Sequence, residues 1–188
     1  MQNLSYPNDI KIKDALPLYF EKYHFSDGGY NDKYFKIKIG PLFIPMPNTK
    51  SRIKAVKFHD VHHLLTEYTA FWKGEVEIGA WEIASGCGKH WIAWLLNFGS
   101  FTIGLFLYPK ALFEAFMAGR HVKSNLYQGY EYNETLLNKT IGELRDEFKI
   151  GQVKKNSASD LLYFGLCILP VFAGIALAGY LFCLLFGI

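Results

Sequence analysis

Residues 51–68, with the sequence SRIKAVKFHDVHHLLTEY, decide the fold and the site that we predict for this chain. Their pattern is helical, and a helix is expected from about Arg52 to Tyr68. Each residue of a helix advances by about 100°, so Asp60 and His63 lie within about 100° of His59 on its surface. Two histidines at positions i and i+4 reach a single ion, and a neighbouring carboxylate completes a third position. We therefore expect this helix to present a metal site.

Two further acidic residues extend the predicted site. Glu67 lies at about 80° from His59 if the helix continues that far, as a fourth ligand or as a partner of the ligands. Gly74 opens a second helix, and a helix–turn–helix folds Glu75 back onto the histidine face. Two nitrogen and two oxygen donors suit zinc, and also iron or manganese. The predicted ligands of this divalent metal are His59, Asp60, His63 and Glu75.

Other interpretations of the segment are less complete. His62 lies at about 300° from His59, away from the shared face, and is expected to satisfy surface or core hydrogen bonds. A zincin protease needs His-Glu-x-x-His with the glutamate as general base, whereas this position holds Asp60. Phosphohydrolases with a His-Asp dipeptide need another histidine on a preceding helix. Only His24 is available, in a region that we do not expect to be helical.

Composition narrows the class of protein. The net charge of the 188 residues is +3, and no stripe of Lys and Arg alternates with stacking aromatics, so no nucleic-acid partner is expected. Cys87, Cys167 and Cys183 form no CxxC pair and are expected to be small hydrophobic residues of a reducing compartment. The first 30 residues mix charged and single apolar residues, so no secretory signal peptide is expected.

The remaining segments are expected to be mainly helical. Residues 1–40 are predicted to be irregular or hairpin-forming, with a short strand at Lys33–Ile39, where lysines alternate with apolar residues. Three prolines forbid a regular helix in Gly40–Thr49, and Ser51 is the expected N-cap of the metal-binding helix. Further helices are expected at 75–84, as a pair around 91–116 ending at Gly119, and within 132–148. We therefore predict an all-α domain of about six helices.

The stretch Leu161–Ile188 contains no charged residue. A helix of this length extends about 42 Å, against about 30 Å of bilayer hydrocarbon, so a tilted transmembrane helix is expected. Pro170 is tolerated in such a helix. Lysines precede the segment and no charge follows it, so the positive-inside rule predicts a cytoplasmic domain held by a tail anchor. The predicted organisation is a helical domain at 1–150, a polar linker at 151–160 and a transmembrane tail anchor at 161–188.

A second apolar stretch, Trp91–Pro109, has no charge but is interrupted by polar residues and glycines. A second membrane span is one interpretation. A buried helix pair, or a helix partly inserted into the membrane interface with Trp91 and Trp94 at headgroup level, is favoured. In each case the stretch can wall an apolar cavity.

The motif His59-Asp60-x-x-His63, followed after eleven residues by Glu75, resembles the HDxxH-x11-E signature of the Coq4 family of ubiquinone biosynthesis proteins. The family usually carries a glycine near Glu67, and its familiar members are peripheral rather than transmembrane, so a related prenyl-lipid or quinone pathway stays open. The resemblance covers roughly residues 45–150. Its flanking elements are Ala80–Gly86, Ala118-Gly119-Arg120 and Ile141–Phe148.

The resemblance implies an all-helical fold with an apolar tunnel for a polyprenyl tail beside the metal, a role that 91–116 fits. It also implies removal of the ring carboxyl of a prenylated hydroxybenzoate, with hydroxylation at that carbon. By analogy the metal binds the ring carboxylate or adjacent phenolate as a Lewis acid. Arg120 or Arg145 is expected to bind the head group of the substrate.

Two functions follow from these expectations. The first is a metal-dependent decarboxylase, a lyase, that acts on a membrane-bound quinone precursor. The second is a non-catalytic scaffold that binds the precursor or another isoprenoid lipid and presents it to other quinone-biosynthesis proteins. Closed coordination by four protein ligands favours the scaffold, and an open position favours the enzyme.

Overall fold

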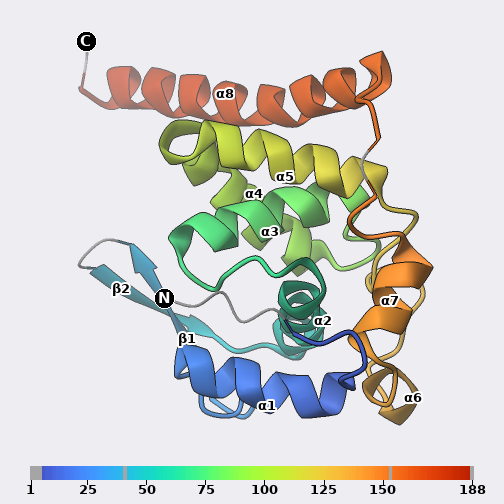
Figure 1. Ribbon diagram of the computed structural model, residues 1–188. Helices are drawn as coiled ribbons and strands as arrows, with labels where there is room; N and C mark the ends of the chain where they lie inside the picture. The colour runs from blue at the N-terminus through green and yellow to red at the C-terminus, as the bar shows by residue number, and fades with distance from the viewer. Residues whose placement is uncertain (1–5, 40–41, 153, 187–188) are drawn as a thin grey trace. The chain divides into compact units, whose positions relative to one another are not determined.

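The computed structural model describes residues 6–39, 42–152 and 154–186. The chain divides into two compact units, Met1–Gln152 and Val153–Ile188. The described residues are mostly helical and include one antiparallel strand pair, so the expectation of an all-α fold holds apart from this pair (Figure 1). The elements are α1 Ile12–Tyr23, β1 Tyr34–Ile39, β2 Leu42–Pro47, α2 Lys50–Thr66, α3 Trp72–Ser85, α4 Trp91–Leu107, α5 Pro109–His121, α6 Glu134–Leu137, α7 Ile141–Phe148 and α8 Ala158–Phe186.

The N-terminal segment differs from the prediction of an irregular region, because it contains α1. The residues of α1 that the fold buries recur at positions i, i+3, i+4 and i+7, which is the pattern of a helix with one apolar face. The strand expected at Lys33–Ile39 is present as β1, and it pairs with β2 so that Tyr34 faces Pro47. Gly40 and Pro41, the start of the predicted proline-rich segment, lie outside the described residues.

Helix α2 begins and ends earlier than predicted. Its N-cap is Thr49 rather than Ser51, because the Thr49 hydroxyl accepts a hydrogen bond from the Arg52 N–H at 3.2 Å. The helix ends at Thr66, because Glu67 adopts the left-handed conformation with φ 61° and its N–H binds the His63 carbonyl. The expected continuation of the helix through Glu67 to Tyr68 is therefore wrong.

Helix α3 packs mainly against α4 and α5. Gly74, which we expected to separate two helices, lies in the first turn of α3, where a Cβ atom would overlap the backbone of Thr69. Gly119 lies equally close to α3, because its Cβ would overlap the Trp81 carbonyl. Both contacts require glycine, and they fix how α3 is held between the loop that precedes it and α5.

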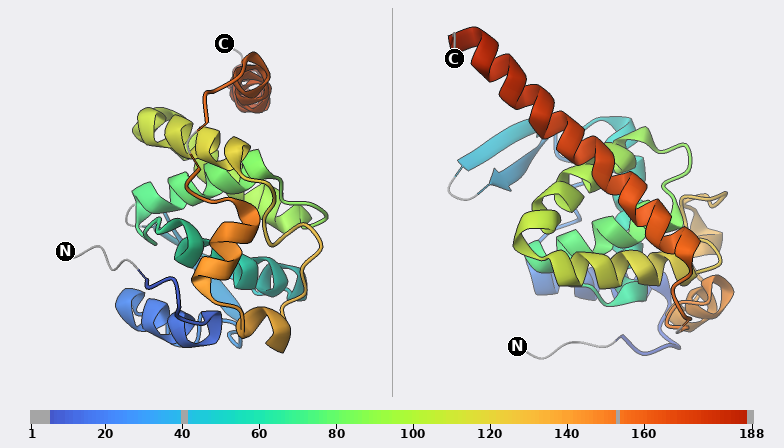
Figure 2. Two further views of the ribbon diagram at one scale, coloured as in Figure 1. Left: turned by 45° about the vertical axis from the view of Figure 1, so that its right-hand side comes forward. Right: turned by 90° about the horizontal axis from the view of Figure 1, so that it is seen from above.

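Four layers of helix follow one another in the first unit: α1, α2, α3, and then α4 with α5 (Figures 1 and 2). Helices α6 and α7 lie beside this stack, α6 against α1 and α7 against α2. The first unit thus has seven helices among its described residues, against the six expected. Helix α2 is central in the stack, and five of its buried residues belong to the main hydrophobic core.

The second unit consists mainly of α8. Within the described residues it has one stretch, Ala158–Leu185, that is long and apolar enough to cross a membrane. The predicted linker 151–160 is shorter than expected, because the helix already begins at Ala158. Gly187 and Ile188, at the end of the predicted anchor, lie outside the described residues.

Candidate metal centre

Three of the four predicted ligands converge. The Nε2 atoms of His59 and His63 are 3.1 Å apart. The Glu75 carboxylate lies across from them, 3.4 Å from His59 Nε2 and 3.5 Å from His63 Nε2. One potential ligand atom from each of these residues lies within 4.8 Å of the other two. The i, i+4 pair on α2 and the first turn of α3 therefore form a group of the kind that holds a metal ion.

The other ring nitrogens show which tautomer each histidine adopts. His63 Nδ1 lies 2.8 Å from the Tyr68 carbonyl oxygen, and His59 Nδ1 lies 3.1 Å from Glu82 Oε1. Both partners are acceptors, so both Nδ1 atoms carry the proton and donate it. Each neutral ring then points an unprotonated Nε2 at the centre. Hydrogen bonds of this kind orient the histidines of metal sites and make them better ligands.

When both imidazole rings are neutral, the centre contains acceptors only. Two Nε2 lone pairs face each other at 3.1 Å, and two carboxylate oxygens complete the group. Acceptors in such contact repel one another unless a cation or a shared proton lies between them. A divalent ion removes the repulsion at both histidines and the carboxylate at once, so these three residues fit a metal by their chemistry and not only by their spacing.

Glu82 of α3 accepts the hydrogen bonds of a buried network that includes His59 and His62. Its side chain is fully buried, and Oε1 accepts hydrogen bonds from His59 Nδ1 and from His62 Nδ1 at 2.7 Å. Its other oxygen, Oε2, accepts from Asn97 Nδ2 at 2.6 Å and from the Tyr127 hydroxyl at 3.1 Å. A buried carboxylate with four donors is satisfied as an acceptor, and it locks His59 in place.

His62 belongs to this hydrogen-bond network and not to the ligand group. Its Nδ1 donates to Glu82, and its Nε2 accepts the backbone N–H of Leu126 at 3.1 Å. Both nitrogens of the neutral ring are therefore used. This confirms the expectation that His62 satisfies core hydrogen bonds.

Asp60, the fourth predicted ligand, is not part of the converging group. Its side chain is buried, and Oδ2 accepts a hydrogen bond from the Tyr30 hydroxyl at 2.6 Å. Burial raises the pKa of the Asp60 carboxyl to about 6, and the charges of His59 and His63 oppose the rise. The carboxyl thus lies near enough to interact with the histidines, and its role as a ligand stays a prediction.

Charge in the centre is unbalanced without a cation. Burial raises the pKa of Glu75 and Glu82, but the hydrogen bonds and charges of the neighbouring histidines outweigh it, and both carboxyls have pKa values well below the usual range. Burial lowers the pKa of His59, but Glu82 and Glu75 outweigh it and raise the pKa well above its ordinary value. Among the ion pairs of the described residues, neither Glu75 nor Glu82 has a lysine or arginine partner. Either a proton on His59 or a metal ion supplies the missing positive charge.

The three residues of the centre differ in their exposure to solvent. The Glu75 side chain is 36% exposed and that of His59 is 18% exposed, whereas His63 is buried. A ligand in the centre is therefore reached past Glu75, at the beginning of α3. Three protein ligands would leave a bound ion a further position for water or a substrate.

Glu67 and Arg145 lie together at the end of α2, and Glu67 is not in the ligand group. The Arg145 guanidinium donates to the carbonyl oxygens of Leu65 at 2.9 Å and Leu64 at 3.2 Å, and it pairs with Glu67 at 2.8 Å. These carbonyls have no partner within the helix, so Arg145 caps the ligand-bearing helix. Its expected contact with a substrate stays a prediction, as does that of Arg120, which lies partly buried in the last turn of α5.

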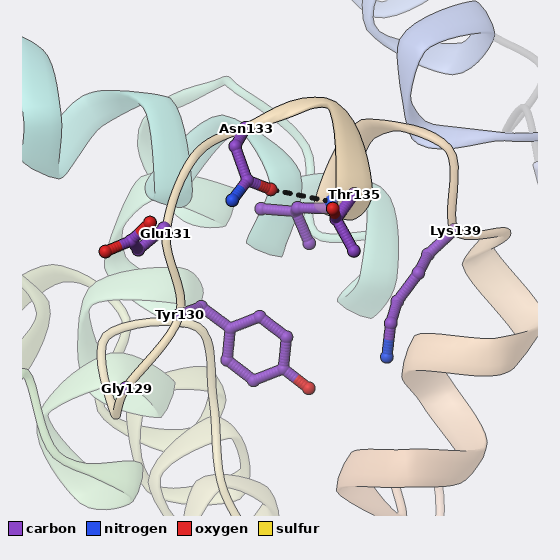
Figure 3. A pocket seen from close by; sticks show the side chains of 7 residues that line it. Gly129, Tyr130, Glu131, Asn133, Thr135 and Lys139 are labelled. Atoms are coloured by element: carbon purple, nitrogen blue, oxygen red, sulfur yellow. Dashed lines mark hydrogen bonds between the residues drawn. The ribbon is translucent and has the colours of Figure 1, made fainter.

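A cavity of about 260 Å³ lies elsewhere in the first unit (Figure 3). Loop residues around α6 line it, including Tyr130, Asn133 and Lys139, and none of the predicted site residues does. It is not the apolar tunnel expected beside 91–116, which stays a prediction. That stretch forms α4 and the beginning of α5, and α4 exposes Trp91, Leu95 and Phe106.

No known protein family, curated protein or solved structure matches the chain. The site is therefore interpreted from its own geometry. Glu82 is the residue that the sequence analysis missed, although its spacing contained the signal. It follows Glu75 by seven residues, which places both carboxylates within about 20° on one face of α3. Asn97 and Tyr127 had no comparable signal, because their contacts depend on the packing of distant segments.

Proposed function

We propose that this chain is a membrane-associated metalloprotein whose centre, formed by His59, His63 and Glu75, binds a divalent ion. Zinc suits the mixed nitrogen and oxygen donors best. The observation that carries the proposal is the convergence of the Nε2 atoms of two histidines and one carboxylate, with both Nδ1 atoms within hydrogen-bonding distance of other acceptors.

The proposed pathway is quinone biosynthesis, with a prenylated hydroxybenzoate as substrate. The proposed reaction removes the ring carboxyl as CO₂, and hydroxylation at that carbon, a two-electron oxidation, takes its oxygen from dioxygen as a second substrate. The support is that each element of the resemblance has a structural part in building the site. Glu67, near which the Coq4 family has glycine, adopts φ 61°, a conformation that favours glycine. Gly119 packs on the α3 backbone, and Arg145 caps α2.

In the proposed reaction a bound metal would act as a Lewis acid toward the ring carboxylate or phenolate. The protein's own groups would orient the histidine ligands. Glu82 orients His59, and the Tyr68 carbonyl orients His63. Access past Glu75 leaves room for a substrate oxygen beside the three protein ligands.

A second candidate function is a scaffold that binds an isoprenoid lipid without changing it. One observation favours it: Glu82, the carboxylate nearest the ligands apart from Glu75 and Asp60, is saturated by four donors and is not free to act as a general base. In this function a bound metal would bind the polar head of the lipid, and partner enzymes would catalyse the reactions.

Helix α8 is proposed to span the membrane, with the first unit on the cytoplasmic side. The support is the length and apolar character of Ala158–Leu185 and the lysines that precede it. Carbonate extraction tests the span. A chain truncated after Ser157 should become extractable, whereas the full chain should not, and free extraction of both would refute the span.

Metal analysis tests the centre. The purified protein should contain close to one equivalent of zinc or another divalent ion, and a His59→Ala/His63→Ala variant should contain almost none. His90→Ala is the matched control, because His90 is a buried histidine outside the ligand group and should leave the metal content unchanged. Equal metal in the double variant and the wild type would refute the centre.

Complementation of a quinone-deficient strain then separates the two functions. Glu75→Gln keeps the shape of the side chain and removes its charge, so it weakens the metal site without opening a cavity. If the protein is the enzyme, a carboxylated prenyl-ring intermediate should accumulate. If it is a scaffold, several intermediates should accumulate together. Normal quinone levels would refute both functions for this residue.

A further inference from the structure

A series of aromatic rings connects the metal centre to the surface. Tyr19 of α1 stacks on the ring of His63, with centroids 5.6 Å apart and an interplanar angle of 26°. Tyr19 also contacts Tyr23 at 5.0 Å and Phe25 at 6.0 Å. Tyr23 in turn contacts Phe71, at the start of α3, at 5.4 Å. The rings form a continuous apolar path that starts at a candidate ligand.

The outer members of this path are exposed. Phe71 is 51% exposed, Trp72 is 40% exposed and Phe25 is 38% exposed. We name Tyr23, Phe25, Phe71 and Trp72 the aromatic rim. Single exposed apolar residues are common on proteins, but contiguous large aromatic side chains at a surface indicate an interaction site.

The N-cap of α3 strengthens this inference. Phe71 occupies that position and makes no side-chain capping hydrogen bond, although Ser, Thr, Asp and Asn are strongly preferred there. The Phe71 ring contacts Tyr23, but about half of the side chain stays exposed. This exposure is explained if the side chain also has an apolar partner outside the domain.

The rim lies at the open side of the centre. The Glu75 N–H donates to the Phe71 carbonyl at 2.9 Å, so the rim and this ligand share the first turn of α3. The Glu75 side chain is also the most exposed of the candidate ligands. A molecule that approaches the metal past Glu75 therefore passes the aromatic rim.

Basic side chains flank the rim. Lys22 Nζ lies 5.1 Å from the centre of the Tyr23 ring, and Lys73, next to Trp72, has a side chain that is 58% exposed and pairs with Glu77. Tryptophan and other aromatic rings with adjacent lysines are typical of protein surfaces that lie at the headgroup level of a bilayer. The chain also contains a helix long and apolar enough to cross a membrane, so a bilayer is the apolar partner within its reach.

We propose that the aromatic rim inserts into the interfacial layer of the membrane, so that a lipid with an anionic head reaches the metal centre directly from the bilayer at this edge. The inference rests on the proposed function, because it takes the occupant of the centre to be a membrane lipid. The inference adds to the proposed function the route by which the lipid enters and the surface that contacts the membrane. The head binds beside Glu75, and the apolar tail stays along the rim.

Tryptophan fluorescence tests the insertion in the full chain, reconstituted in bilayer nanodiscs. The chain has four tryptophans, and Trp81 is fully buried. In a Trp91→Phe/Trp94→Phe variant, quenching from the bilayer or from water therefore reports on Trp72. The matched blank carries Trp72→Phe in addition. Phosphatidylcholine brominated near the head end of its acyl chains is the membrane quencher, and acrylamide is the aqueous one.

The brominated lipid should quench the emission of the double variant at least twofold more strongly than that of the blank, and acrylamide should quench it weakly. Strong acrylamide quenching without lipid quenching would show that the rim lies in water and would overturn the inference. Protection from both quenchers would show that protein covers the rim, and would also overturn it. Metal content is measured in the same samples, so a rim that fails while metal is retained leaves the proposed centre intact.

Discussion

Replacement of Glu82 by glutamine should weaken metal binding although Glu82 is not a ligand. The glutamine amide has the shape of the carboxylate but no charge, and one end of it is a donor. The carboxylate now accepts two hydrogen bonds at each oxygen. In either orientation of the amide, its NH₂ group faces side chains that donate, either the two histidines or Asn97 and Tyr127. The Tyr127 hydroxyl can rotate to accept, but at least one donor conflict remains in each case.

The magnitude follows from these contacts. Loss of a partner that orients a metal-bound histidine typically costs 10–100-fold in affinity, or about 1.4–2.8 kcal/mol. Each buried donor left without an acceptor costs about 1–3 kcal/mol of folding stability. Glu82→Gln should therefore lower zinc affinity by about 10–100-fold and destabilise the metal-free protein by about 2–4 kcal/mol.

Competition titration against a zinc chelator measures the affinity, and thermal unfolding monitored by circular dichroism measures the stability. Glu114→Gln is the matched control, because this α5 side chain is 64% exposed and pairs only loosely with Lys110, at 3.9 Å. It should change neither quantity. Wild-type affinity in a folded Glu82→Gln protein would refute the orienting role of Glu82.

Three further predictions follow from the contacts described. Because neighbouring carboxylates raise the pKa of His59, a proton competes with the metal for this ring. Metal affinity should therefore fall about tenfold per pH unit below that pKa, and calorimetry in several buffers would detect the released proton. In the metal-free protein, the stabilisation from protonated His59 should be complete below about pH 6.5 and lost as pH rises through the raised pKa, and pH-independent unfolding would contradict this. Arg145→Ala should destabilise the protein by about 2–4 kcal/mol because α2 loses its cap. An unchanged melting temperature together with weaker lipid binding would instead show that Arg145 binds the substrate. Gly119→Ala should cost about 1–3 kcal/mol because its methyl group overlaps the Trp81 carbonyl, and equal denaturant midpoints would refute that contact.

Local patterns predicted the core of the candidate site. The angular spacing of His59 and His63 depends only on helix geometry, and α2 has that geometry at both residues. The convergence of Glu75 was also predicted, because the two helices join through a short turn. Position along the two helices was sufficient to predict these three residues, although packing contacts such as that of Tyr19 on His63 also hold them in place.

Features set by tertiary contacts were not predictable in the same way. The end of α2 depends on the left-handed backbone of Glu67, which a glutamate does not predict, and on Arg145, 80 residues after Leu65 in the chain. The network around Glu82 needs Asn97 and Tyr127 from separate segments. Helix α1 is a different case. Its apolar spacing was visible, but Gly28, Gly29 and Gly40 favoured an irregular or hairpin-forming segment.

The partners of the polar side chains of α2 come late in the chain, and this affects synthesis. The Leu126 N–H that binds His62 lies 64 residues after it, and Arg145 lies 80 residues after Leu65. At about 5–20 residues per second, α2 leaves the ribosome roughly 4–16 s before its C-terminal cap exists. A single helix of this length is marginal in water, and during this interval His62 lacks its Leu126 partner and the end of the helix lacks its cap. Chains that stop before residue 126 should therefore be cleaved readily by proteases, and stable metal loading should be a late event, after the last of these contacts has formed.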